Sequence, residues 1–281
     1  MKTSVLHATA FLAAVLALSP PWPSSSCTAE TLYGVTALNL VTIDPVDPAN
    51  VTIVGPHNLS LRPFSLAYDP KNGVMAGTAI TTSGNTRRLI HFDLSTGSGT
   101  DVASLGDSQS GFYEGIEYVD SLATFVAGFD DGPSAGNADK IRTVDLFGNT
   151  SPVVTTTPPI DNDAAVYDST RGIFYTLDAK GTNELRQVNL MTGAHEFRAS
   201  IPLLTDQSIA YSAELDVIFL EAGGELYRAD AAAPTSFTLV GAITGSRVLG
   251  LAFVIPEPKS LFLLAWCSIV GMILVKRRDF R

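Results

Sequence analysis

The stretch Phe64-Ser-Leu-Ala-Tyr-Asp69 decides the fold, because the chain repeats its pattern four more times. Each copy is a short apolar segment that reaches an aromatic residue near its end. The later copies are Gly115-Ile-Glu-Tyr-Val-Asp120, Asp163-Ala-Ala-Val-Tyr-Asp168, Ser208-Ile-Ala-Tyr-Ser212 and Gly250-Leu-Ala-Phe-Val254. The repeated aromatic residues, which stand 50, 49, 44 and 42 positions apart, are Tyr68, Tyr118, Tyr167, Tyr211 and Phe253. A period of this size is typical of an array of equivalent structural units.

Three more strands complete each unit. After the copy Phe64–Asp69, these strands are residues 74–79, residues 89–93, which end in an acid, and residues 102–105. The turn Ser95-Thr-Gly97 separates the last two. Four short strands with Gly, Asn and Asp at the joins, repeated every ~40 to 50 residues, predict the blades of a β-propeller. The body of the chain has no convincing helical period. We therefore expect an all-β fold.

The order of strands at the two ends of the body predicts how the ring closes. The body begins with strands of the second, third and fourth kinds, 32–35, 40–44 and 51–54, and ends on a strand of the first kind, 248–253. Pairing the last strand with the first three completes a fifth blade and removes an open sheet edge. We expect five four-stranded blades over residues 30–253, with the repeated aromatics in equivalent places between neighbouring blades.

The N-terminal residues 1–29 predict a secretory signal peptide. Lys2 precedes an apolar region over residues 5–18, prolines end it, and Cys27-Thr-Ala29 places small residues where a signal peptidase reads. We expect cleavage after Ala29. A lipoprotein attached through Cys27 is a weaker alternative, because Ser24-Ser-Ser26 stands where aliphatic residues are needed.

The C-terminal residues 254–281 combine three features. Pro256, Glu257 and Pro258 precede an uncharged run over residues 261–275, which is followed by the basic cluster Lys276, Arg277 and Arg278. The run predicts a transmembrane helix whose basic end stays in the cytoplasm. A fifteen-residue helix is only ~22 Å long against ~30 Å of hydrocarbon, so the span is marginal.

These three parts, in this order, resemble the PEP-CTERM sorting tail of exported bacterial proteins. The resemblance implies a partner, an exosortase-type membrane peptidase that recognises the Pro-Glu-Pro strip and removes the tail. Two departures are Ile255, where Val is commoner, and Asp279-Phe-Arg281 after the basic cluster. A plain C-terminal anchor is the alternative. Residues 31–253 are also similar to the broad group of propellers with phrases such as Leu-Ala-Tyr-Asp and Leu-Tyr-Gly.

Charge and cysteine content exclude several functions. Residues 1–29 and 256–281 hold six of the 18 cations and two of the 28 acids, which leaves a body with 12 cations and 26 acids, a net charge of −14. Such a surface excludes nucleic acid as a partner. Both cysteines, Cys27 and Cys267, lie outside the body, so it has no disulfide and no cysteine metal site.

Residues with catalytic or metal-binding chemistry are sparse. The body has three scattered histidines, His57, His91 and His195, and no Gly-x-Ser-x-Gly elbow, so we assign no catalytic residues and no cofactor. His91 alternates with apolar neighbours and is expected to be a satisfied structural histidine. The acids Asp130, Asp131 and Asp139, with Asn137, offer oxygen ligands for calcium, although a solvated loop is the more ordinary interpretation.

Three further patterns have structural interpretations. Arg87-Arg88 is expected on a loop, and Thr155-Thr-Thr-Pro-Pro159 predicts a stiff connector between blades. Repeated acids close to strand ends are expected to bind backbone N–H groups two residues on, in Asx turns. They are Asp44, Asp69, Asp93, Asp145, Asp168 and Asp230.

The sequence thus predicts a secreted or cell-envelope protein, held at least transiently in the membrane by its tail. Its propeller is expected to be a non-catalytic binding or matrix component with extracellular polysaccharide or envelope proteins as partners. The alternative is an exported lyase or glycan hydrolase that uses the central cleft. Clustered carboxylates with a His or Arg in that cleft would favour the enzyme.

Overall fold

The computed structural model describes residues 29–83, 86–107, 112–130, 140–160, 162–178, 183–202 and 207–255. Residues Glu30–Ile255 form one compact unit. The expected signal peptide, sorting motif, membrane run and basic cluster lie outside the described residues, apart from Ala29, Val254 and Ile255 at their borders. Among the residues described, no helix has the length and apolar character needed to cross a bilayer.

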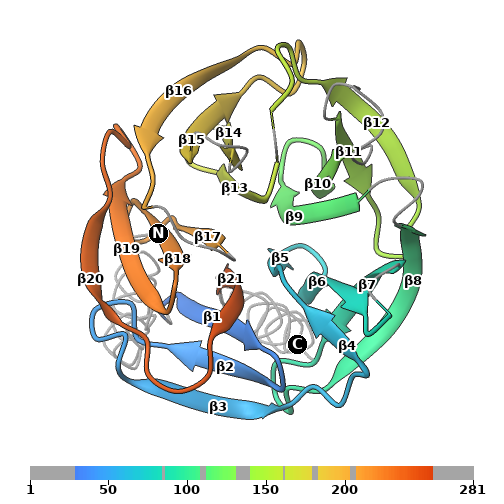
Figure 1. Cartoon of the computed structure of the whole chain (residues 1–281), viewed down its shortest axis with the longest axis vertical. Coiled ribbons are helices and arrows are strands. Elements are labelled where there is room, and N and C mark those ends of the chain that lie inside the picture. The colour runs from blue at the N-terminus through green and yellow to red at the C-terminus, as the bar shows by residue number, and fades with distance from the viewer. Residues whose placement is uncertain are drawn as a thin grey trace, which may run out of the picture. The chain divides into compact units, whose positions relative to one another are not determined.

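Five antiparallel sheets stand around a ring as the blades of a propeller, as the sequence predicts (Figure 1). We number the blades in chain order and name the strands from the centre of the ring outward. Blade 1 contains β21 (Val248–Val254), β1 (Thr31–Thr36), β2 (Asn39–Ile43) and β3 (Val51–Pro56). Blade 2 contains β4 (Leu61–Pro63) and β5 (Ala67–Asp69), which share the innermost position, then β6 (Val74–Thr81), β7 (Thr86–Phe92) and β8 (Gly99–Asp107).

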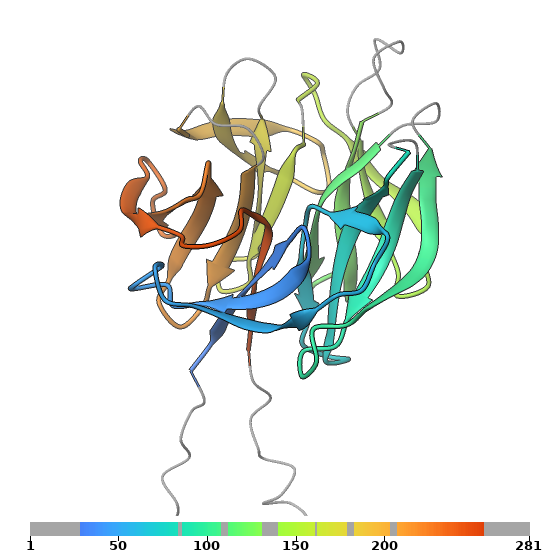
Figure 2. The ribbon, with the colours of Figure 1, turned by 60° about the horizontal axis from the view of Figure 1, so that its bottom comes forward.

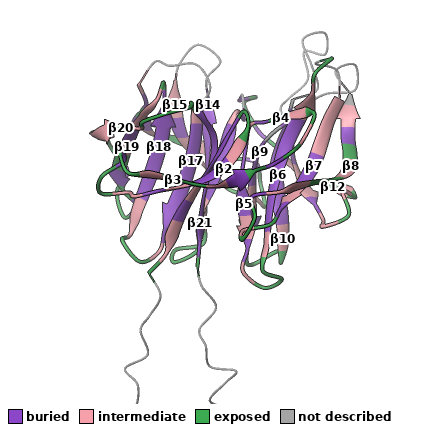
Figure 3. Ribbon diagram, turned by 90° about the horizontal axis from the view of Figure 1, so that it is seen from below, coloured by how far each residue is buried: buried purple, intermediate pink, exposed green. Residues whose placement is uncertain are grey.

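The other three blades have the simple four-stranded order. Blade 3 contains β9 (Phe112–Val119), β10 (Thr124–Asp130), β11 (Lys140–Val144) and β12 (Thr150–Thr155). Blade 4 contains β13 (Ala164–Asp168), β14 (Ile173–Asp178), β15 (Glu184–Val188) and β16 (His195–Ser200). Blade 5 contains β17 (Gln207–Ser212), β18 (Val217–Ala222), β19 (Glu225–Asp230) and β20 (Thr238–Ala242). Burial is greatest on the inner strands and falls towards the outermost ones (Figure 3).

The ring closes between the two ends of the body, which confirms the predicted closure. Strand β21 pairs antiparallel with β1, with Leu32 opposite Phe253 and Val35 opposite Gly250. All seven residues of β21 are buried. The last strand of the chain therefore fills the innermost place of the first blade, and no inner edge is left open.

The hydrophobic core is divided into five clusters, one between each pair of neighbouring blades. Each cluster contains or contacts one repeated aromatic residue, as predicted. Buried rings are Tyr118 between blades 2 and 3, Tyr211 between blades 4 and 5, and Phe253 between blades 5 and 1. Tyr68 and Tyr167 are partly buried against the remaining two clusters.

Side chains at the turns confirm the Asx-turn prediction for five of the six acids. Asp44 accepts a hydrogen bond from the Val46 N–H at 2.8 Å, and Asp93 accepts one from the Ser95 N–H at the same distance. Asp69, Asp145 and Asp230 accept equivalent bonds from the N–H two residues on, whereas Asp168 accepts one from Arg171, three residues on. These acids therefore fix the strand connections.

Two local expectations need correction. Arg87-Arg88 lies inside β7 rather than on a loop, because Arg87 covers the Phe64 ring at 4.6 Å and Arg88 pairs with Asp101 at 2.8 Å on the next strand. The sequence pattern also predicts a strand over residues 122–128, but Leu122 is exposed in the turn before β10, which begins at Thr124. Residues 155–159 do connect blade 3 to blade 4, as predicted, with a cis peptide bond between Thr157 and Pro158.

Candidate functional site: the mouth of the central channel

The innermost strands all end on the same face of the ring. We define the exit face by Glu30, Ile255 and the turns that follow the first and third strands of each blade, at residues 44–50, 70–73, 93–98, 120–123, 145–149, 169–172, 189–194, 213–216 and 231–237. Thr31 and Val254 are paired on β1 and β21, so the body begins and ends side by side on this face (Figure 2).

A small pocket of about 60 Å³ marks the mouth of the channel on the exit face. All five repeated aromatics contribute to its wall, together with Glu117, Asp120, Ser169 and Ile255. A pocket of this size has room for a few waters, since each needs ~10 to 15 Å³, and is far smaller than the ~300 Å³ or more of a typical ligand pocket.

Glu117 is the most perturbed acid at this mouth. Burial raises the pKa of its carboxyl to about 8, and the charge of Asp120 adds to the effect, against the opposing hydrogen bond from the Tyr118 N–H at 2.8 Å. Partial desolvation and the charge of Asp69 also raise the pKa of Asp120. Glu117 therefore holds a proton at neutral pH, and the mouth carries less negative charge than its acids suggest.

Glu117 was not among the candidate residues from the sequence, although the repeat contains a signal for it. In the other four copies of the opening pattern the residue before the aromatic is apolar and buried: Ala67, Val166, Ala210 and Ala252. A carboxyl group in this one place departs from the pattern. Perturbed acids in a concave site are candidates for function, so this departure identifies the residue to test.

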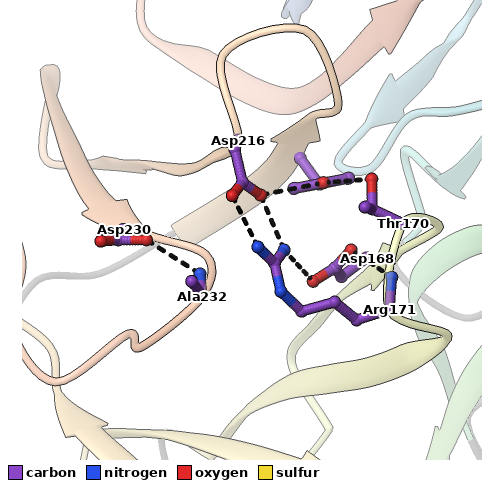
Figure 4. Close-up of polar contacts among 7 residues, drawn as sticks. Asp168, Thr170, Arg171, Asp216, Asp230 and Ala232 are labelled. Atoms are coloured by element: carbon purple, nitrogen blue, oxygen red, sulfur yellow. Dashed lines mark hydrogen bonds and ion pairs between the residues drawn. The ribbon is translucent and has the colours of Figure 1, made fainter.

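The hydroxyl of Tyr211 binds across the boundary between blades 4 and 5. Tyr211 donates to Thr170 of blade 4 at 2.8 Å and lies 3.2 Å from Asp216 of its own blade. Burial, with the charges of Asp168 and Asp216, raises the pKa of Tyr211 to about 12. Arg171 joins the same network through both acids (Figure 4). These residues therefore stabilise the boundary between blades 4 and 5.

The three histidines lie away from the mouth. The His57 ring is buried, with Nε2 2.9 Å from the Ala37 carbonyl and Nδ1 accepting from the Leu59 N–H at 3.2 Å. His195 Nε2 lies 2.7 Å from the Pro158 carbonyl, and its Nδ1 faces Arg186. Burial lowers the pKa of His91, whose Nε2 has no partner among the described residues, so it is structural but not satisfied as expected.

Most of the calcium candidates fall outside the described residues. Asp131, Asn137 and Asp139 lie outside the described residues, and Asp130 is described by its main chain alone, at the end of β10. In the part of the chain that the structure describes, no group of three His, Cys, Asp or Glu side chains could hold a metal ion.

A larger groove of about 290 Å³ lies on the opposite face, in blades 5 and 1. Its wall consists of the β18–β19 turn Gly223-Gly224, the connector residues Ile243, Gly245, Ser246 and Arg247, and Val248 at the start of β21. The wall therefore combines apolar side chains, Ile243 and Val248, with the polar side chains of Ser246 and Arg247.

Comparison with known proteins identifies the fold and no family. No family model and no curated protein matches the chain. Among solved structures, a chain of the nidogen/laminin complex is similar with a TM-score of 0.53 and 14% identity, over 80% of this chain and 98% of that one. TolB from Acinetobacter baumannii gives a TM-score of 0.50 and 13% identity, over 81% and 67%.

A gluconolactonase from Xanthomonas campestris is similar with a TM-score of 0.49 and 10% identity, over 80% of this chain and 79% of that chain. At this level of identity the likeness shows the propeller fold alone, because one fold carries many functions.

Proposed function

We propose that the protein is exported, held and sorted through its C-terminal tail, and displayed as a non-catalytic propeller that binds extracellular polysaccharide or envelope proteins. The observation that carries the proposal is that Thr31 and Val254 pair on the exit face. Leader and tail therefore join the body on the same side. The opposite face, with its 290 Å³ groove, stays free for a partner.

A contact made by Glu30, the first residue of the body, supports cleavage after Ala29. The Glu30 backbone nitrogen donates to the Glu214 carboxylate at 2.9 Å, and Ser212 donates to the Glu30 side chain at 2.6 Å. After cleavage the same nitrogen becomes an ammonium group, and a charged donor strengthens a hydrogen bond to a carboxylate. A mature protein starting at Glu30 thus keeps its first strand fixed to blade 5.

Mass spectrometry of the mature protein tests both ends. The expected mass corresponds to a chain that starts at Glu30 and ends near Pro256-Glu257-Pro258, after processing by an exosortase-type peptidase. Replacing these three residues with Ala leaves signal and span untouched, so export is retained while uncut protein accumulates in the membrane. If both proteins keep residues 261–275 and have otherwise equal masses, the tail is an ordinary anchor.

An enzyme is a second candidate because Glu117, protonated at neutral pH in a pocket, has the state that a general acid requires. The small volume of the pocket weighs against a glycan substrate there. Hydrolase and lyase assays on polysaccharides, with the Glu117→Gln variant as control, separate the two functions. Turnover that disappears in the variant would establish the enzyme.

A further inference from the structure

Large apolar side chains gather on the exit face. Ten such residues are exposed in the described part of the chain, and six of them belong to this face: Val46, Leu122, Phe147, Met191, Leu215 and Ile255. The other four are Leu38 on the opposite face and Ile53, Phe197 and Leu239 on the outermost strands. Single exposed hydrophobic residues need no explanation, whereas several that project from the turns of one face can act together when that face meets an apolar phase.

Three of the six are held outward by the same device. Val46, Phe147 and Met191 follow the third strand of blades 1, 3 and 4, and each is the residue whose N–H binds an Asx side chain, at 2.8, 2.8 and 2.9 Å. Their side chains are 79%, 77% and 92% exposed. The Asx turns therefore fix the backbone beneath projecting apolar groups, so little conformational freedom remains to be lost on binding.

The length of the chain beyond Ile255 indicates what this face meets. Ile255 is the last residue described and belongs to the exit face, and only residues 256–260 separate it from the uncharged run that begins at Leu261. Five extended residues span at most ~17 Å. A body joined to a membrane span by so short a strip cannot move far from the lipid surface.

We propose that the exit face docks on the exported side of the membrane that holds the tail, with Val46, Phe147 and Met191 inserted among the lipid headgroups. The proposal rests on the proposed membrane-held tail. Apolar groups that enter the interfacial region are stabilised by removal from water. Docking places the Pro-Glu-Pro strip at the level of a membrane-embedded peptidase.

Charge predicts the kind of lipid. Asp47, Asp120 and Glu214 are exposed on the exit face, where the cations are Lys71 and Arg171, and the second of these is engaged by two acids. Anionic headgroups repel such a surface, whereas zwitterionic headgroups do not. We therefore expect deeper insertion into phosphatidylcholine vesicles than into vesicles rich in phosphatidylglycerol, with the difference reduced by salt.

Site-directed spin labels on the full-length chain test the docking. The body contains no cysteine, so after replacement of Cys27 and Cys267 by Ala each label position is unique. Labels at Phe147→Cys and Met191→Cys are compared with a label at Leu38→Cys, which is 69% exposed on the opposite face. In phosphatidylcholine vesicles we expect the first two to show severalfold lower accessibility to a water-soluble nickel chelate and higher accessibility to oxygen.

Three other patterns of accessibility would contradict the docking or the membrane-held tail. If all three labels are equally accessible to nickel while a label on native Cys267 reports lipid, the tail is in the membrane and docking is wrong. If the Cys267 label is itself accessible to nickel, the membrane-held tail falls, and the docking with it. If labels at 147 and 191 lose nickel accessibility without gaining oxygen, the face contacts protein, such as a second copy of the chain.

A matched pair of triple variants identifies the side chains responsible. With the reporter at Leu122→Cys, Val46→Ser, Phe147→Ser and Met191→Ser together should restore nickel accessibility to the level at position 38. The control replaces Ile53, Phe197 and Leu239 by Ser, removing three exposed apolar groups from the outermost strands instead. The proposal requires the control to leave the reporter buried in lipid; equal effects of the two triples would overturn it.

Discussion

Arg171 of blade 4 donates two hydrogen bonds to the carboxylate of Asp216 in blade 5, at 2.7 and 2.6 Å. The same guanidinium pairs at 2.8 Å with the fully buried Asp168 carboxylate, which also accepts the Arg171 N–H (Figure 4). One side chain therefore ties the turn after β13 to the turn after β17. This fork is the geometry in which Arg is not replaceable by Lys.

This pair predicts a pH dependence of stability. The hydrogen bonds from Arg171 lower the pKa of Asp216 below its ordinary value. The stabilisation is therefore complete above the unfolded-state pKa of about 3.9 and is lost as the pH falls through the lower folded-state value. Urea unfolding of Asp216→Asn between pH 3 and 7 should show the smallest difference from wild type at the acid end. A constant difference would contradict the assignment.

The raised pKa of Glu117 predicts that folding stability changes with pH in the opposite direction. Because its folded-state pKa is raised to about 8, the folded protein binds a proton that the unfolded chain releases near pH 4.3, so stability falls as the pH rises between these values. Glu117→Gln should flatten that slope and be more stable than wild type above pH 8. Asp120→Asn serves as the companion variant, since removing its charge should shift the slope to lower pH.

Tyr211 predicts how strongly the inter-blade core depends on its repeated ring. Its side chain is buried between blades 4 and 5, so Tyr211→Ala should cost about 3 to 5 kcal/mol of unfolding free energy. Tyr211→Phe keeps the ring and loses the bond to Thr170, at a cost of about 0.5 to 1.5 kcal/mol. Denaturant titration measures both. Equal losses would show that the hydroxyl, and not packing, carries the stabilisation.

Gly115 predicts how tightly the inner strands pack around the channel. A Cβ on Gly115 would stand 2.3 Å from Ala164 Cα and 2.4 Å from the Ala165 nitrogen, on the innermost strand of the next blade. Because backbone cannot move aside cheaply, Gly115→Ala should destabilise by at least about 1 to 3 kcal/mol. Gly73→Ala, which meets nothing within 4 Å but has a φ of +65°, measures the backbone effect alone. Similar losses would contradict the close approach.

The sequence predicts the fold well because the repeat encodes it locally. Each repeated aromatic joins one cluster between two blades, as Tyr118 does, and Asp93 accepts a hydrogen bond from the N–H two residues on, as its counterparts at the ends of other third strands do. Closure of the ring was also predictable. The N-terminal blade lacks its innermost strand, and the body ends on a strand of that kind, β21.

The mouth and the exit face were not predictable, because they join residues from different blades. The raised pKa of Glu117 depends on the desolvation imposed by neighbouring strands, which no local pattern reports. From the sequence alone, Phe147 and Met191 are ordinary turn residues. Only the strand directions show that their turns lie on the same face. Arg87 likewise required the position of Phe64 before its strand could be assigned.

Because β21 pairs with β1, the first blade can be completed only when the end of the body has been synthesised. Roughly two hundred residues separate Thr36, at the end of β1, from the end of its partner strand. At ~5 to 20 residues per second, the inner edge of β1 waits about 10 to 40 s for its partner to be made. During that interval blades 2 to 5 can fold in turn, while blade 1 offers an unpaired strand to any neighbouring chain. During synthesis, misassembly is therefore most probable at blade 1, whose strands β1 to β3 are made first. The exposed edge is covered once β21, immediately before the tail, has been made.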